Sequence, residues 1–457
     1  MAIAIIILLL VIGTVIFHFV SPWWFTPLAS NWSAIDSTIE LTFWITGIVF
    51  VAVNVFLVYV IFRYRHKPGL KADYEPENKK LEGWLTLATT IGIAAMLAPG
   101  LYIWGQFVAP PENAIEVEAV GQQWHWSYRF PGADGQLGKV DTRLISEDNP
   151  FGLDPSDPAG QDDILIFGNE LVLPLDQPVK VLLRSKDVLH NFTVPQFRVK
   201  MDLVPGMLSS LWFTPTRIGA FDLMCEELCG MGHYAMRGRV VVKEHEDFAD
   251  WLARQVTFAQ TQDRVAGDSA LGRAHYQVCA SCHGAAGEGN QALNAPRVAG
   301  QDIWYLRRQL HNYQQGIRGS AEGDQFGGQM IAMAGLVADE QSMQHLLAYI
   351  DTLPEPARAP AEGNLSNGRQ LYRNCVYCHG EQAQGIYHMN APRLAGLEPW
   401  YLARQIGYFR DRIRGGHPDD FYGAQMSLLV QSLRSEDDIA DIVAYINSLS
   451  VADSTAD

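Results

Sequence analysis

The chain has 457 residues, enough for about three domains, and 48% of them are hydrophobic, so it can bury cores without disulfide cross-links. Its formal net charge of −16 argues against nucleic acid as a partner and fits a solvated acidic surface or a basic partner. The six cysteines form three close pairs, each in a separate motif, which leaves none for a disulfide framework.

Two uncharged apolar runs, residues 42–62 and 84–107, are each long enough to cross the roughly 30 Å hydrocarbon layer as a helix. The segment between them carries six lysine and arginine residues, and none precedes it. The positive-inside rule therefore places this segment in the cytoplasm and everything after residue 108 on the outer face. Buried helices of a soluble protein are the alternative.

The first twenty residues are also apolar, but they lack the basic start and the small-residue cleavage site of a secretory signal. We expect a retained third span over about residues 2–20, with a cleaved signal as the alternative. Residues 1–110 would then form a transmembrane anchor in contact with membrane lipids.

Residues 111–250 contain short strand-like runs separated by glycine, proline and aspartate, which predicts a small all-β barrel or sandwich. A cluster of soft metal ligands closes this region, with donors at Cys225, Cys229, His233 and Met236 and a second imidazole upstream at His190. Thiolates, imidazoles and a thioether suit copper. Zinc is the competing metal, although a zinc site normally has four closed ligands and no thioether.

An ungapped internal repeat follows, with an offset of 96 residues: CASCHG returns as CVYCHG, and NAPRVAG as NAPRLAG. This register indicates two copies of one all-α unit, at 266–353 and 363–450. A Pro/Ala-rich stretch between them has the composition of a short linker.

The C-x-x-C-H pattern in each copy is typical of covalent haem attachment, in which two thiols form thioethers and the adjacent imidazole binds iron. A thioredoxin-like C-x-x-C is the alternative, but neither copy lies in a βαβ pattern. For the sixth ligands, Met330 corresponds to Met426, whereas Met333 corresponds to Leu429. The predicted haem-binding residues are Cys279, Cys282, His283 and Met330 in the first unit and Cys375, Cys378, His379 and Met426 in the second. Iron with His and Met ligands has no open position for oxygen and suits electron transfer.

With the haem motif at its start, a late methionine and a closing helix, each unit resembles a class I cytochrome c. The tandem arrangement resembles the dihaem cytochromes. By this resemblance, the carbonyls of Pro296 and Pro392 accept hydrogen bonds from the ligand imidazoles and fix their orientation.

Three stretches, GQQWHWSYRF, VLHNFTVPQFRVKMDLVPG and CEELCGMGHYAM, resemble subunit II of cytochrome c oxidase. That family has a membrane-anchored Greek-key cupredoxin barrel with a dinuclear copper A centre, and the resemblance covers about residues 41–245. The copper ligands that it implies are the bridging thiolates of Cys225 and Cys229, the imidazoles of His190 and His233, the Met236 thioether and the Glu227 carbonyl.

The same resemblance implies roles for three further side chains. Glu227 would reach a magnesium ion at the contact with subunit I. Trp124 would receive electrons, with a packed interface aromatic as the alternative. Glu82 would lie at the cytoplasmic mouth of a proton path, although an acidic residue also suits the first turn of a helix.

The resemblance implies the electron-input subunit of a haem–copper terminal oxidase, multi-pass in a bacterial inner membrane, with its copper and haem domains on the periplasmic face. Two coppers and two c-type haems would pass electrons to a catalytic subunit I, which reduces oxygen to water and pumps protons beside other oxidase subunits. A quinol–cytochrome c reductase or a soluble cytochrome c would be the donor. The alternatives are the copper A subunit of a nitric oxide reductase and a stand-alone membrane electron carrier. Which haem accepts electrons first stays open.

Overall fold

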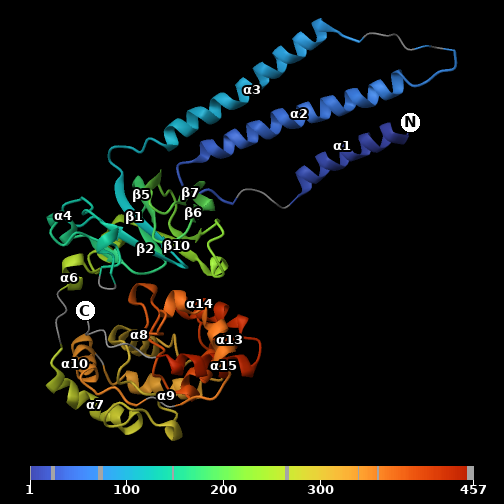
Figure 1. Ribbon diagram of the computed structural model, residues 1–457. Helices are drawn as coiled ribbons and strands as arrows, with labels where there is room; N and C mark the ends of the chain where they lie inside the picture. Colours follow the sequence, from blue (N-terminus) through green and yellow to red (C-terminus); the bar gives the residue numbers. More distant parts are fainter. Residues whose placement is uncertain are drawn as a thin grey trace.

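The computed structural model describes residues 2–21, 26–69, 71, 76–146, 149–262, 267–337, 339–357 and 360–449. The predicted unit boundaries at 266 and 450 lie outside the described residues. Three regions follow one another along the chain: an elongated helical anchor, a β domain and a pair of helical repeats (Figure 1).

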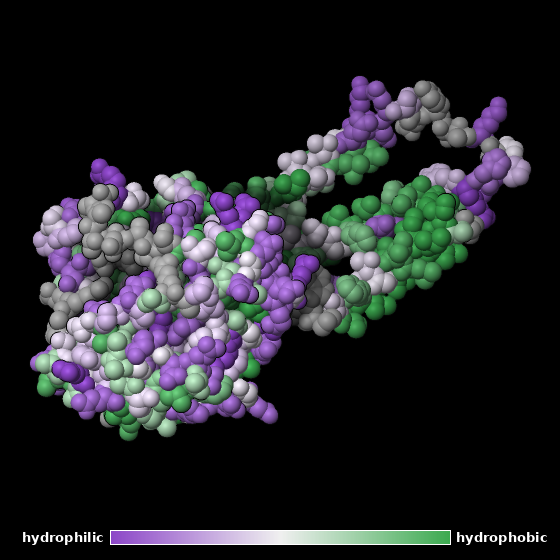
Figure 2. All heavy atoms as spheres, turned by 60° about the horizontal axis from the view of Figure 1, so that its bottom comes forward, coloured by the Kyte–Doolittle hydropathy of each residue, from purple (hydrophilic) through white to green (hydrophobic). Residues whose placement is uncertain are grey.

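The anchor consists of α1 (Ala2–Val20), α2 (Ser33–Arg63) and α3 (Lys79–Phe107), each long and apolar enough to cross a membrane. Its apolar side chains extend away from the more polar body of the molecule (Figure 2). Helix α2 begins at Ser33, before the apolar run that starts at residue 42. Its polar first turns are helical and contact the β domain. There Asp36 accepts a 2.6 Å hydrogen bond from Arg198. Helix α3 begins at Lys79 because the Asn78 side chain caps it.

The β domain contains two five-stranded sheets, in the orders β3-β2-β1-β5-β8 and β4-β10-β9-β6-β7. The strands are β1 (Ile115–Gln122), β2 (His125–Phe130), β3 (Ile164–Ile166), β4 (Glu170–Pro174), β5 (Val179–Ser185), β6 (His190–Val194), β7 (Val199–Leu203), β8 (Ser209–Phe213), β9 (Gly219–Met224) and β10 (Arg237–Lys243). Side chains of both sheets share one core, in which the rings of Trp126 and Phe192 meet edge to face. The predicted all-β domain is confirmed.

One short helix, α4 (Pro158–Gln161), lies between β2 and β3. Two more, α5 (His245–Leu252) and α6 (Phe258–Gln262), follow the last strand. The first repeat contains α7 (Ser269–His283), α8 (Ile303–Gln314), α9 (Gln325–Ala334) and α10 (Glu340–Asp351). The second contains α11 (Leu365–Tyr372), α12 (Val376–His379), α13 (Pro399–Arg410), α14 (Phe421–Leu429) and α15 (Glu436–Ser448). Single 3-10 turns lie at Thr142–Leu144, Pro195–Phe197, His233–Ala235, Gln291–Leu293, Tyr387–Met389 and Val430–Ser432.

In each repeat the first and last helices cross at a glycine. A Cβ on Gly272 would overlap the backbone of His345, and one on the equivalent Gly368 would overlap the backbone of Asp441. The absence of a side chain at these glycines lets α7 approach α10 and α11 approach α15. The named elements of both repeats are helices, so the predicted all-α units are confirmed.

The two repeats face each other with reciprocal contacts. Arg308 donates a 2.9 Å hydrogen bond to the side chain of Asn390, and the equivalent Arg404 donates one of 2.9 Å to Asn294. Asn390 is also the equivalent of Asn294, so each arginine binds the same asparagine of the opposite repeat. The repeats are therefore related by a local pseudo-two-fold axis.

Candidate metal and haem sites

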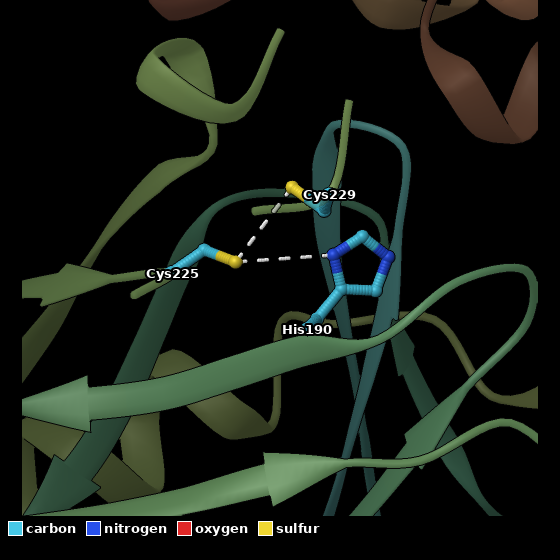
Figure 3. Close-up of side chains that lie close together, drawn as sticks. All are labelled: His190, Cys225 and Cys229. Carbon is cyan, nitrogen blue, oxygen red and sulfur yellow. Dashed lines mark hydrogen bonds between the residues drawn. The ribbon is translucent and has the colours of Figure 1, made fainter. Parts of the chain in front are cut away.

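The clustered soft donors come together at one edge of the β domain. His190 opens β6, and Cys225 directly follows β9. The Cys225 sulfur lies 3.8 Å from that of Cys229 and 3.9 Å from Nδ1 of His190 (Figure 3). All three residues are buried, and one ligand atom from each lies within 4.8 Å of the others.

The loop between β9 and β10 supplies the remaining donors. Nδ1 of His233 and Sδ of Met236 lie 3.5 Å and 3.9 Å from the Cys229 sulfur. The carbonyl oxygen of Glu227 lies 3.4 Å from the Cys225 sulfur. The structure therefore brings the other four predicted donor groups around the two sulfurs, and this mainly soft set fits copper because hard-ion sites use oxygen ligands.

The protonation chemistry of the two cysteines also suits a metal. The hydrogen bond between them lowers the pKa of Cys225 to about 3, and the same coupling raises the pKa of Cys229. A thiolate is the form of cysteine that binds metal. One thiolate of the pair is thus available before a metal enters.

Sequence reasoning missed Asp187, whose Oδ1 lies 2.8 Å from Nε2 of His190. Burial acts to lower the pKa of His190, but hydrogen bonds with Asp187 and Cys225 outweigh it and raise the pKa. Carboxylates of this kind fix the tautomer and the ring orientation of metal-binding histidines. The available signal was an aspartate three residues before a candidate ligand.

Trp124 packs beneath the donor loop. Its Nε1 donates a 3.1 Å hydrogen bond to the carbonyl of Cys229, and its ring lies where a Cβ on Gly232 would be. Gly232 is therefore needed for the close approach of ring and loop. This contact joins Trp124 directly to the backbone of a donor residue.

The imidazoles of the two C-x-x-C-H motifs are held as predicted. Nδ1 of His283 donates to the carbonyl of Pro296 at 2.6 Å, and Nδ1 of His379 donates to the carbonyl of Pro392 at 2.8 Å. Burial lowers the pKa of both histidines, to about 4 for His379. Both rings are therefore neutral near pH 7, with Nε2 left for a metal.

A cavity of about 390 Å³ extends through both repeats. Its lining includes Cys279, His283, Met330, Cys375, Cys378, His379 and Met426, and also Met389. Nε2 of His379 is buried without a hydrogen-bond partner among the described residues, as expected for an atom that would bind iron. Three of the four haem-attachment cysteines, both histidines and both candidate methionines thus line one cavity that fits a haem site, while Cys282 is exposed.

Glu82 lies in the first turn of α3, at the end of the anchor away from the β domain (Figure 1). Glu227 lies in the donor loop and is partly exposed. The proton role of Glu82 and the magnesium role of Glu227 stay predictions.

Comparison with known proteins gives family matches over most of the chain that follows the three apolar helices. The model described as the periplasmic domain of cytochrome c oxidase subunit II matches residues 115–244, and the cytochrome c model matches 269–354 and 365–450.

Among relatives, the alternative cytochrome c oxidase subunit 2 of Bradyrhizobium diazoefficiens is 56% identical over 276 residues, which cover 60% of this chain and 98% of that protein. The cytochrome c oxidase subunit 2 of Cereibacter sphaeroides is 29% identical, covering 46% of this chain and 74% of the relative. Among solved structures, reduced recombinant cytochrome c4 from Pseudomonas stutzeri is 27% identical with a TM-score of 0.34, covering 40% of this chain and 100% of that one.

Proposed function

The chain belongs to the cytochrome c oxidase subunit II family and is the electron-input subunit of a haem–copper oxidase, and we propose which of its residues hold the redox groups. Copper A and haem c, when bound, supply one-electron carriers. The observation that carries the assignment is the convergence of four further donor groups on two buried sulfurs.

In this proposal the thiolates of Cys225 and Cys229 would hold the two copper ions. The other donors are His190, His233, the Met236 thioether and the Glu227 carbonyl. The β scaffold holds these donors close together, so little rearrangement is needed when the ions bind. The Asp187 carboxylate orients the His190 ring, and the buried position of both thiols excludes water from them.

Each repeat would hold one c-type haem. Cys279 and Cys282 attach the first and Cys375 and Cys378 the second, while His283 and His379 present Nε2 to the iron. Met330 and Met426 complete the ligand pairs, because they occupy equivalent positions on α9 and α14 and line the same cavity.

The finer roles of three side chains belong to this proposal as well. Glu227 would reach a magnesium ion at the contact with the catalytic subunit, and Glu82 would serve the cytoplasmic end of a proton path. Trp124 would conduct electrons to the copper site, which its hydrogen bond to Cys229 supports.

The three apolar helices fit a membrane anchor for a periplasmic copper domain. We propose that all three cross a bacterial inner membrane and that the chain associates there with a catalytic subunit I and other oxidase subunits. A quinol–cytochrome c reductase or a soluble cytochrome c would supply the electrons.

Purification from native membranes in mild detergent tests the proposal. Mass spectrometry should find a haem–copper catalytic subunit, and the sample should consume oxygen in a cyanide-sensitive manner. Met231→Leu, at an exposed loop methionine outside the donor set, should retain copper and activity, whereas Met236→Leu should weaken copper binding. A partner that consumed nitric oxide but not oxygen would contradict the oxidase assignment.

A further inference from the structure

The β domain is in direct contact with the second repeat. The ring of Trp124 meets that of Tyr377 edge to face, with centroids 5.7 Å apart and an interplanar angle of 68°. Tyr377 lies between Cys375 and Cys378, the two cysteines of the second haem motif. The same contact thus reaches the copper donor loop on one side and the haem-attachment segment on the other.

Two further tyrosines of the second repeat complete this interface. The hydroxyl of Tyr422 donates a 2.8 Å hydrogen bond to the carbonyl of Phe167, and its ring lies 5.9 Å from that of His125. The ring of Tyr387 lies 5.7 Å from that of Phe167. Helix α14, which carries Tyr422, lies beside the β domain in Figure 1.

The first repeat has different residues at all three positions. The 96-residue offset places Ser281 opposite Tyr377, Gln291 opposite Tyr387 and Phe326 opposite Tyr422. Phe326 packs under the guanidinium of Arg404, 4.9 Å from its ring centroid, just as Tyr422 packs under Arg308 at 4.8 Å, but Phe326 has no hydroxyl to donate. Because the repeats otherwise share helices, glycines and reciprocal contacts, the three tyrosines distinguish the repeat that contacts the copper domain.

Exposure differs at one of the three pairs, because Tyr387 is partly buried and Gln291 is exposed. Tyr377, 52% exposed, lies at the rim of the interface. Ser281, Cys282 and Gln291 are all exposed on the first repeat. Trp124 is only 4% exposed, because the donor loop and the second repeat cover it. A soluble protein therefore cannot reach the Trp124 ring without displacing the second repeat, whereas Ser281 and Gln291 on the first repeat are exposed.

We infer that the second repeat is a built-in partner docked on the copper domain by Tyr377, Tyr387 and Tyr422, and that an external reduced one-electron carrier protein docks on the first repeat around Ser281 and Gln291. The pseudo-two-fold relation supports this occupant, because the open face is the counterpart of the face by which the second repeat already meets a redox domain. The inference rests on the proposed function and adds a direction to it: the first repeat faces the donor, and the second faces the copper.

Cross-linking tests the docking without any measurement of activity. In the full haem- and copper-loaded chain in detergent, Phe167→Cys with Tyr387→Cys should be joined within one molecule by a short bis-maleimide, detected by peptide mass spectrometry. The matched control, Phe167→Cys with Gln291→Cys, places the second thiol at the equivalent point of the first repeat and should not be joined. Equal yields, or a higher yield with Gln291→Cys, would overturn the docking.

A second set of variants keeps the test decisive if Tyr387→Cys disturbs the interface. Tyr422→Phe introduces the residue that the first repeat has at this position and removes only the hydroxyl. The loss of one hydrogen bond should raise the fraction of undocked chains about fivefold. The readout is faster maleimide labelling of Phe167→Cys in that background. Phe326→Tyr, the reverse exchange in the first repeat, should leave labelling unchanged, and no difference between these two variants would contradict the role of the tyrosines.

The donor face has its own probe, a reduced soluble c-type cytochrome mixed with the loaded chain in a stopped-flow spectrometer. A bulky maleimide polymer on Gln291→Cys should slow haem reduction by the probe at least tenfold, and the same polymer on the exposed Gln136→Cys of the copper domain should not. An unchanged rate with modified Gln291→Cys would overturn the assignment of this face. Failure of the oxygen-uptake assay alone would instead contradict the proposed function and leave these results standing.

Discussion

The copper domain and the haem repeats assemble their ligands in different ways. In the copper domain, five of the six donor groups come from one short loop between β9 and β10, and only His190 comes from elsewhere. In each repeat, the cysteines and histidine lie on or beside early helices, while the methionine lies on a later one across a cavity. A loop site depends on local backbone geometry, whereas a distributed site depends on helix packing, so the two should respond differently to substitution.

The largest effect should come from the centre of the loop site. Cys229→Ser removes a sulfur that lies close to Cys225, His233 and Met236, and a hydroxyl is a poor ligand for copper. We expect complete loss of the dinuclear copper signal in electron paramagnetic resonance, with both c-type haem bands unchanged. Loss of the haem bands as well would show that the two regions fold as one unit and do not assemble their ligands independently.

The interface between the repeats should give the next largest effect. Nη1 and Nη2 of Arg414 donate to Gln405 and Gln309, and all three residues are buried. Arg414→Met removes one of the two guanidinium donors to each amide oxygen and leaves only Arg318, which should lower the free energy of unfolding of the repeats by about 1–3 kcal/mol.

The pseudo-symmetry supplies a matched variant. Arg318 donates to Gln309 and Gln405 in the mirrored arrangement, so Arg318→Met should cost about the same as Arg414→Met. Arg410→Met, at a more exposed ion pair with Glu436, should cost less than about 1 kcal/mol. Thermal unfolding followed at the haem bands measures all three, and markedly unequal costs for the mirrored pair would contradict the two-fold relation.

The methionines test the distributed sites. Met426→Leu should keep the haem covalently attached but lower its reduction potential by on the order of 0.1 V, since axial ligands set haem potentials over a range of about 0.8 V. Met330→Leu should do the same to the other haem, whereas Met333→Leu and Met389→Leu should change neither potential. Redox titration distinguishes these outcomes, and a shift with Met389→Leu, which also lines the cavity, would move the ligand assignment.

Most of this organisation was predictable because motifs carried it. The donors in the loop between β9 and β10 could be recognised from residue type and spacing. The ungapped repeat located the haem units and favoured Met330 over Met333 as a ligand. The structure then brought the six donors together and placed Met330 and Met426 on one cavity. Their roles as ligands remain predictions.

What the sequence did not reveal depends on contacts between distant segments. The Trp124–Tyr377 contact joins residues of two domains, and no local pattern distinguishes a docking tyrosine from a surface one. The early start of α2 is a similar case. The polar sequence of its first turns does not by itself indicate a helix. These turns are joined to the β domain by the ion pair between Asp36 and Arg198, which is far along the chain.

Asp187 gives the sharpest contrast between the two regions. Asp187→Asn keeps the size of the side chain but replaces the carboxylate that holds Nε2 of His190, so copper affinity should fall about 10- to 100-fold. Competition with a chelator measures this, and Asp176→Asn, in the turn between β4 and β5, serves as a control that should leave affinity unchanged.

The haem histidines have no equivalent substitution. Their Nδ1 atoms donate to the backbone carbonyls of Pro296 and Pro392, which a change of side chain does not remove. A copper affinity unaffected by Asp187→Asn would mean that the β scaffold alone orients His190, as the backbone orients His283 and His379. A clear fall would mean that the copper site can be tuned through one carboxylate, while the imidazoles of the haem sites are fixed by the fold.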